Sequence, residues 1–144
     1  MNTTSLLKKY KISVFDLSIQ EVNPGDILNE LLESEDYITG SHPVKGRWEN
    51  SYLESYLTPS VSRLLNRACA EAKQAYGDQF IVPSQFLGYP NNEYWFNMAR
   101  PGESTGVHNH KDESTVSGVY YLQVSPDSSD LYFRTGDAVE FSVK

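Results

Sequence analysis

The first half of the chain places apolar residues at helical spacing. Asn23-Pro24 offers a helix N-cap followed by proline at the first helical position. Ile27, Leu28, Leu31 and Leu32 then recur every three to four residues, the period of one helix face. The pattern predicts a helix that begins at Pro24 and is stopped by Gly40.

A second helix is indicated between Pro59 and Gly77. Thr58 is the expected cap, Pro59 the first helical residue and Gly77 the stop. One face of this helix is apolar and consists of Val61, Leu64, Leu65, Ala68, Ala72 and Tyr76. Before it, residues 10–15 are predicted to form a short opening strand, and the polar, turn-rich residues 41–56 a loop. The acidic residues Glu30, Glu33, Glu35 and Asp36 are expected to form a solvated helix face.

After Gly77 the pattern changes to short runs typical of strands. They are separated by turn residues such as Pro101-Gly102 and Thr135-Gly136-Asp137, and they cover residues 80–89, 94–99, 104–110, 116–124, 131–134 and 138–143. Helices followed by a meander of strands predict an α+β fold whose β part is a sandwich or barrel. We expect one domain over residues 1–144, helical to about residue 78 and β from about residue 79.

Charge and hydropathy exclude two classes of partner. The net charge is −7, and the 12 Lys and Arg residues are scattered, which argues against nucleic-acid binding. No apolar run approaches the ~20 residues that span a membrane, and the first residues lack the core of a signal peptide. We therefore expect a cytoplasmic protein. The single cysteine, Cys69, lies in the apolar helical stripe and is expected to be a small buried residue.

Candidate chemistry is concentrated at His108 and His110, two of only three histidines. Side chains at i and i+2 of a strand share a face, so both imidazoles can converge on one metal ion. Asp112 and Glu113 follow and provide carboxylates. Imidazole with carboxylate suits iron, zinc or manganese, and two histidines with one carboxylate suit iron(II) that activates oxygen. The third histidine, His42, is expected at the surface.

The segment around this pair resembles a known family over about residues 94–134. The resemblance lies in Trp95-Phe96-Asn97-Met98-Ala99-Arg100-Pro101-Gly102, then His108-Asn109-His110, then Ser117-Gly118-Val119-Tyr120-Tyr121-Leu122. In this combination the chain looks like the 2-oxoglutarate- and iron(II)-dependent oxygenases that are related to prolyl hydroxylases. The resemblance implies an antiparallel double-stranded β-helix of the jelly-roll or cupin-like type, complete or incomplete.

The same resemblance implies site residues and ligands. His108 would be the first iron ligand and His110 the second, with Asp112 as a further or alternative ligand. Asn97 and Tyr120 would make polar contacts to 2-oxoglutarate, the co-substrate. The reaction implied is hydroxylation of a C–H bond in a peptide or small-molecule substrate.

The sequence departs from the family pattern after the histidine pair. Such oxygenases use a distal histidine and an arginine on later strands, and no histidine follows His110. We therefore expect a C-terminally truncated version, completion by a partner, or a non-catalytic binding or interaction module. By itself the chain is expected to bind metal weakly and to turn over little 2-oxoglutarate, and an open sheet edge is expected to favour homo-oligomers.

A second resemblance leaves the chemistry open. Gly102, His108, His110, Glu113 and Gly118 are similar to a loosened first motif of the cupins. In that reading His108, His110 and Glu113 would bind manganese, iron or zinc. The implied fold is the same as for the oxygenases.

Overall fold

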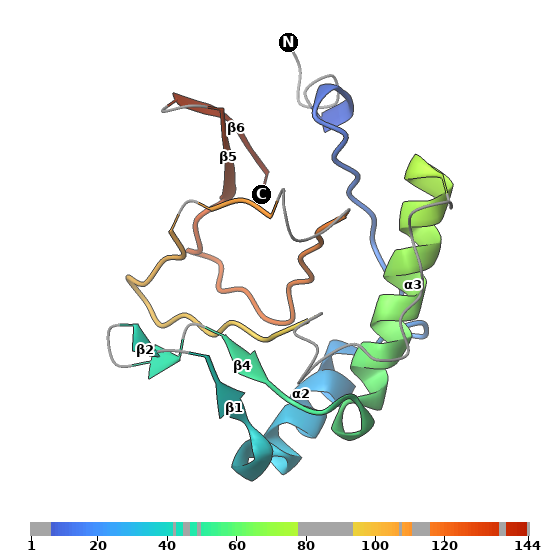
Figure 1. Cartoon of the computed structure of the whole chain (residues 1–144), viewed down its shortest axis with the longest axis vertical. Helices are drawn as coiled ribbons and strands as arrows, with labels where there is room; N and C mark the ends of the chain where they lie inside the picture. The colour runs from blue at the N-terminus through green and yellow to red at the C-terminus, as the bar shows by residue number, and fades with distance from the viewer. Residues whose placement is uncertain are drawn as a thin grey trace. The chain divides into compact units, whose positions relative to one another are not determined.

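The structure is a computed structural model that describes residues 7–41, 43–44, 47–48, 50–77, 94–106, 108–110, 116–135 and 138–143 (Figure 1). The chain divides into two compact units. The larger unit is Ser18–Tyr120, and the smaller unit combines Met1–Leu17 with Tyr121–Lys144. Within the part that the structure describes, no helix has the length and apolar character needed to cross a membrane.

Helix α2, Pro24–Glu33, begins where the sequence predicts. The Asn23 side chain accepts a hydrogen bond from the Gly25 backbone N–H at 2.9 Å, which caps the helix. The predicted end at Gly40 is wrong. The Ser34 N–H bonds to the carbonyls of both Glu30 and Leu31, so the last turn tightens, and the 3-10 helix η1, Glu35–Tyr37, follows.

Helix α3, Pro59–Tyr76, has the predicted bounds and packs against α2 (Figure 1). Gly77 ends it with φ +88°, a backbone conformation that glycine adopts at little strain. The predicted cap is only half right, because Thr58 occupies the cap position without making a side-chain cap bond. The short η2 helix, Ser55–Leu57, leads into it.

The start of α3 is capped from α2 instead. Glu30 accepts hydrogen bonds from the Ser60 N–H, 3.1 Å to each carboxylate oxygen, and from Ser60 Oγ at 2.5 Å. Arg63 also donates to Ser60 Oγ, at 2.6 Å. Glu30 is therefore not part of a solvated acidic face, because its charge is used at the positive end of the α3 dipole.

Residues 41–56 were predicted to be a loop, but three two-residue strands lie within them and a fourth lies just before them. These are β1 Thr39–Gly40, β2 Pro43–Val44, β3 Arg47–Trp48 and β4 Ser51–Tyr52. β1 pairs antiparallel with β4, and β2 with β3. Because each strand is two residues long, the segment shows no alternating pattern that would have revealed it.

The segment after the undescribed residues 78–93 joins this sheet at one residue. Phe96 forms an antiparallel bridge with Ser51, whose N–H and carbonyl bond reciprocally to Phe96 at 2.9 and 2.8 Å. The buried apolar residues among those described are Val22, Ile27, Leu53, Val61 and Tyr94, all in the larger unit. The core thus lies between the two helices and the Leu53–Tyr94 side of this small sheet.

Several predicted strands are not formed. The described residues of 10–15, 104–110 and 116–124 contain no strand, residues 94–99 contain only the Phe96 bridge, and residues 80–89 lie outside the described part. Strands need a buried face, whereas residues 116–119 are all exposed and Gly118 adds no side chain to pack.

The last two predicted strands are confirmed within the smaller unit. β5, Leu131–Thr135, pairs antiparallel with β6, Ala138–Val143, and the register shifts between Phe133 and Arg134. Ser142 Oγ donates to Asp130 at 3.0 Å beside this hairpin. Helices with small antiparallel sheets make the chain an α+β protein, as predicted.

Candidate metal centre at a histidine pair

Around the antiparallel Phe96–Ser51 bridge, successive side chains of each segment lie on alternate faces. Residues directly opposite in an antiparallel pair share a face, and successive residues alternate. The register therefore places Asn50 opposite Asn97 and Tyr52 opposite Trp95 on one face. The other face carries Leu53, Tyr94 and Phe96.

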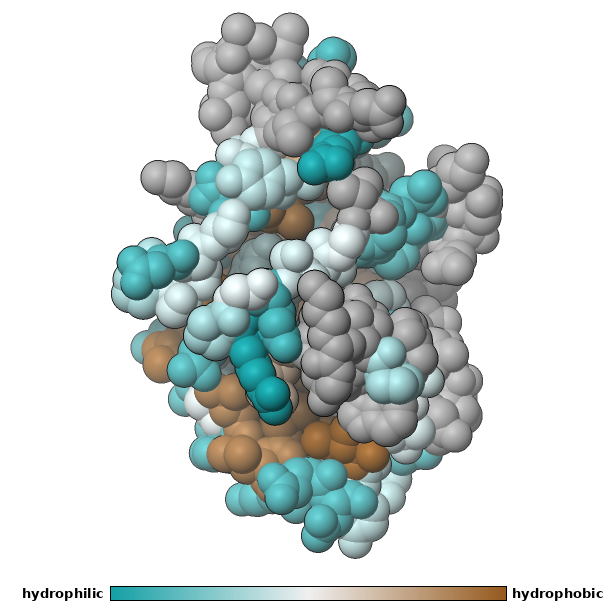
Figure 2. Space-filling model, turned by 90° about the vertical axis from the view of Figure 1, so that its left-hand side faces the viewer, coloured by the Kyte–Doolittle hydropathy of each residue, from teal (hydrophilic) through white to brown (hydrophobic). Residues whose placement is uncertain are grey.

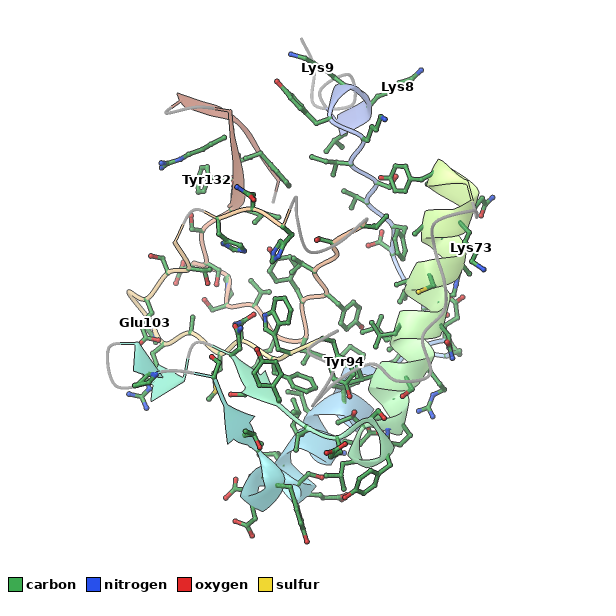
Figure 3. All side chains as sticks on the ribbon, in the orientation of Figure 1. Lys8, Lys9, Lys73, Tyr94, Glu103 and Tyr132 are labelled. Carbon is green, nitrogen blue, oxygen red and sulfur yellow. The ribbon has the colours of Figure 1, made fainter. Side chains whose placement is uncertain are left out.

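The second face is held in the core of the larger unit. Tyr94 is 8% exposed, its hydroxyl lies 2.6 Å from Thr58 Oγ1, and its ring meets Phe96 edge-on at 5.9 Å (Figure 3). Burial raises the pKa of the Tyr94 hydroxyl; the Thr58 hydrogen bond opposes this, and the charges of Glu54 and Glu30 add to it. This anchor fixes the strand segment against the start of α3.

The histidines lie on the face that carries Trp95. The ring of His110 is 6.0 Å from that of Trp95, tilted by 40°. The rings of His108 and His110 are 4.9 Å apart and nearly perpendicular, at 89°. The two imidazoles are therefore in contact, but not for the predicted reason, because neither residue is in a strand. His108 is exposed and His110 is half-buried.

One hydrogen bond decides which nitrogen of His108 is available. Nδ1 lies 2.9 Å from the Gly106 carbonyl oxygen, which can only accept, so Nδ1 carries the proton. In the neutral ring the lone pair is then on Nε2. Metal-binding histidines commonly donate their second N–H to a backbone carbonyl in this way, which fixes the tautomer and the ring orientation.

The separation of the two rings also fits a shared ion. With metal–nitrogen bonds of about 2.0–2.1 Å, each ring centre lies roughly 3.2 Å from the ion. Two such rings at a tetrahedral or octahedral angle are about 4.5–5.2 Å apart, and the observed 4.9 Å falls in that interval. The separation of the ring centres is therefore compatible with two ligands of one metal ion.

The described residues offer the histidine pair no third metal-binding side chain. No group of three metal-binding side chains occurs in the described ranges. Asp112 and Glu113, the carboxylates that the sequence offers, lie outside them, as does His42.

Asn97 and Tyr120, the residues predicted to contact 2-oxoglutarate, have different surroundings. Asn97 is on the Trp95 face, where its Nδ2 donates to Asn50 Oδ1 at 3.0 Å. Asn50 Nδ2 in turn donates to the Tyr52 hydroxyl at 3.2 Å. Tyr120 is half-buried in the same unit. Asn50 and Tyr52 were not predicted as part of the site. Their i, i+2 spacing is the one sequence feature that indicates a shared face, and it lies in a segment predicted to be a loop.

A tight turn separates Asn97 from the histidines. The Glu103 N–H bonds to the Arg100 carbonyl at 3.0 Å, and the Glu103 carboxylate accepts from the Arg100 N–H at 2.8 Å (Figure 3). Gly102 has φ +83°, and Pro101 precedes it, which is the arrangement of a type II turn. The Pro101-Gly102 turn predicted from the sequence is therefore confirmed.

Comparison with known proteins matches this part of the chain to a family of oxygenases. Residues 93–143 fit the profile of a family described as "Putative 2OG-Fe(II) oxygenase". The match includes the histidine pair, Asn97 and both strands of the β5–β6 hairpin, and it covers less than half of the chain. It supports an oxygenase-like function and implies iron and 2-oxoglutarate. No curated protein and no solved structure matches the chain significantly.

Proposed function

We propose that the protein is an iron(II)- and 2-oxoglutarate-dependent oxygenase of the prolyl-hydroxylase-like type, acting in the cytoplasm on a C–H bond of a peptide or small molecule. The observation that carries the proposal is the paired arrangement of His108 and His110, with His108 Nδ1 bound to the Gly106 carbonyl. The oxygenase-family match over the same residues supports it. The proposal includes a double-stranded β-helix for the β part of the chain.

Each residue then has a defined task. His108 and His110 would hold the iron, with Asp112 completing the shell. Bound iron would supply the activation of oxygen that is coupled to oxidation of 2-oxoglutarate. The Gly106 carbonyl accepts the Nδ1 proton of His108 and leaves Nε2 as the nitrogen that could bind iron, and the Trp95 ring lies beside His110 at 6.0 Å.

The co-substrate would contact the polar part of the same face. We assign Asn97 and Tyr120 to this contact. An amide and a phenol each donate a hydrogen bond to a carboxylate oxygen without adding charge. A cupin-type site with Glu113 in place of Asp112 is the second candidate, because both carboxylates follow the same histidine pair.

The direct test is succinate release by anaerobically iron-loaded protein supplied with 2-oxoglutarate, ascorbate and oxygen. The unmutated protein should release succinate, and His108→Ala should not. Metal analysis of both proteins gives an independent readout, because His108→Ala should retain less iron. Equal iron content with equal succinate release would overturn the proposal. Binding of 2-oxoglutarate without any turnover would indicate a non-catalytic binding module instead.

A further inference from the structure

We propose that Trp95 is a positioning residue of the histidine pair, whose ring helps to hold the His110 imidazole at the angle at which it meets His108. The inference rests on the proposed function and deepens it, because it names a residue that acts on the metal site through a ligand. It also connects the histidine pair to the core of the larger unit through a side chain that is not itself a ligand.

The backbone of Trp95 is fixed by both of its neighbours. On one side, Tyr94 is 8% exposed and its hydroxyl lies 2.6 Å from Thr58 Oγ1, just before α3. On the other side, the Phe96 N–H donates to the Ser51 carbonyl at 2.8 Å, and the Phe96 carbonyl accepts from the Ser51 N–H at 2.9 Å. Successive side chains of an extended segment alternate in direction, so the two core-facing neighbours direct the Trp95 ring to the opposite face.

The Trp95 ring is one of the groups against which His110 packs. Residues 104–106 and 108–110 form no strand, so no sheet register places the histidines. The half-buried His110 ring lies 6.0 Å from the Trp95 ring at a tilt of 40°, within the range over which two aromatic rings attract each other. It also meets the ring of His108, which is exposed. Trp95 thus adds a contact with an anchored backbone to the other interactions of His110.

The first test is made on the metal-free protein. Trp95→Leu keeps an apolar side chain and removes the ring, whereas Trp95→Phe retains a ring. Nuclear Overhauser cross-peaks between the ring protons of His108 and His110 report their contact, since the ring centres are 4.9 Å apart. Trp95→Leu should weaken these cross-peaks, and Trp95→Phe should retain most of their intensity. Tyr56→Leu, which removes an exposed ring from the same unit, is the matched control and should leave them unchanged.

The second test measures cobalt(II) affinity by calorimetry, and it shows whether the position of the ring matters for binding. Cobalt(II) serves as the probe because it accepts imidazole ligands as iron(II) does. Trp95→Leu should weaken cobalt(II) binding about fivefold, the range of one aromatic pair, and Trp95→Phe should bind close to the unmutated protein. In the His110→Ala background, Trp95→Leu should have no further effect, because the ring that it positions is absent.

The outcomes separate the inference from the proposed function. Unchanged cross-peaks in Trp95→Leu would overturn the inference and leave the proposed function intact. An equal loss of cobalt(II) affinity with and without His110 would do the same, because Trp95 would then act on another part of the site. If the unmutated protein does not bind cobalt(II), the proposed function fails, and the role of Trp95 in metal binding fails with it.

Discussion

The backbone carbonyl of Gly106 determines which nitrogen of His108 carries the proton. By accepting the Nδ1 proton of His108, it leaves Nε2 as the nitrogen that can bind a metal. The ring of His110 is set differently, through its contacts with Trp95 and with His108 itself. The orientation of the His110 ring is thus tied to that of His108, whereas the His108 ring also has a backbone partner of its own.

His108→Ala and His110→Ala should each lower iron(II) affinity tenfold or more, about 1.4 kcal/mol. Because Trp95 lies 6.0 Å from His110, its fluorescence should report metal binding directly. The Trp48→Phe background leaves Trp95 as the single tryptophan for anaerobic titration. His42→Ala is the matched imidazole control and should bind like the parent. Unchanged affinity in both pair variants would exclude the site.

Asp112→Ala and Glu113→Ala distinguish the oxygenase from the cupin arrangement in the same titration. A loss confined to Asp112→Ala supports the two-histidine, one-carboxylate site that we propose. A loss confined to Glu113→Ala supports the cupin reading. If neither carboxylate affects affinity, the third ligand comes from another part of the protein.

Tyr94 predicts a response to alkaline pH. Because burial raises the pKa of its hydroxyl in the folded protein, the unfolded chain loses this proton at a lower pH than the folded chain. The contribution to stability is complete below about pH 10 and is lost as the pH rises through the folded-state pKa.

Tyr94→Phe should therefore flatten the decline of melting temperature above pH 10 relative to the parent. At neutral pH it should lower the free energy of unfolding by about 1 kcal/mol, because the hydrogen bond to Thr58 is lost. Tyr56→Phe, which changes an exposed tyrosine, is the control. A parallel decline in parent and Tyr94→Phe would show that Tyr94 ionises alike in both states.

At the level of elements, α2 and α3 are joined by the Glu30 carboxylate of α2, which accepts a hydrogen bond from the first turn of α3. Thr58 would ordinarily cap α3, but its hydroxyl lies against Tyr94 instead. Glu30 satisfies the buried Ser60 N–H in its place. The same side chain also brings a negative charge to the N-terminus of α3.

Glu30→Ala should lower the free energy of unfolding by about 1–3 kcal/mol, because it leaves the buried Ser60 N–H without its acceptor. Glu33→Ala removes an exposed glutamate from the same helix and should change stability by less than about 0.5 kcal/mol. Urea unfolding followed by circular dichroism measures both. Equal effects of the two variants would contradict the capping role.

The helices and the last hairpin were predictable from sequence because their signals are local. Asn23-Pro24, Pro59 and Gly77 act on the backbone next to them, and β5 and β6 are close neighbours in the sequence. The bridge from Phe96 to Ser51 and the contact of Asn50 with Asn97 join distant segments, so no local pattern reveals them. The contact of His108 with His110 was predicted from i, i+2 spacing on a strand, and that reason was wrong because the structure forms no strand at these residues.

At the scale of the whole molecule, exposed apolar residues and sheet edges offer surfaces for association. In the larger unit, Leu32 at the end of α2 is 69% exposed and Ile38 just before β1 is 36% exposed. Figure 2 shows apolar side chains gathered in the lower part of the view, the region where α2 and β1 lie in Figure 1. In the smaller unit, β5 and β6 pair only with each other among the described strands.

We predict that the protein forms homo-oligomers through the edge of the β5–β6 hairpin. An unpaired strand edge favours pairing with a second copy, and lysine on an edge opposes it. Tyr132→Lys, at an exposed position of β5, should therefore shift the protein toward monomer in light scattering after gel filtration. Tyr37→Lys, an exposed tyrosine in the larger unit, is the control. A monomeric parent protein would contradict the prediction.

The long sequence separation across the Phe96–Ser51 bridge has a kinetic consequence. Asn50 and Asn97 are 47 residues apart, and Thr58 and Tyr94 are 36 apart. Closing a loop of that length costs about 3 kcal/mol in chain entropy, whereas a helix forms from neighbouring residues within about a microsecond. During refolding, the far-ultraviolet signal of the helices should therefore develop before the Trp95 fluorescence in the Trp48→Phe background. The face that carries Trp95 and the histidine pair would then be the last part of the larger unit to assemble and, on dilution into denaturant, the first to open.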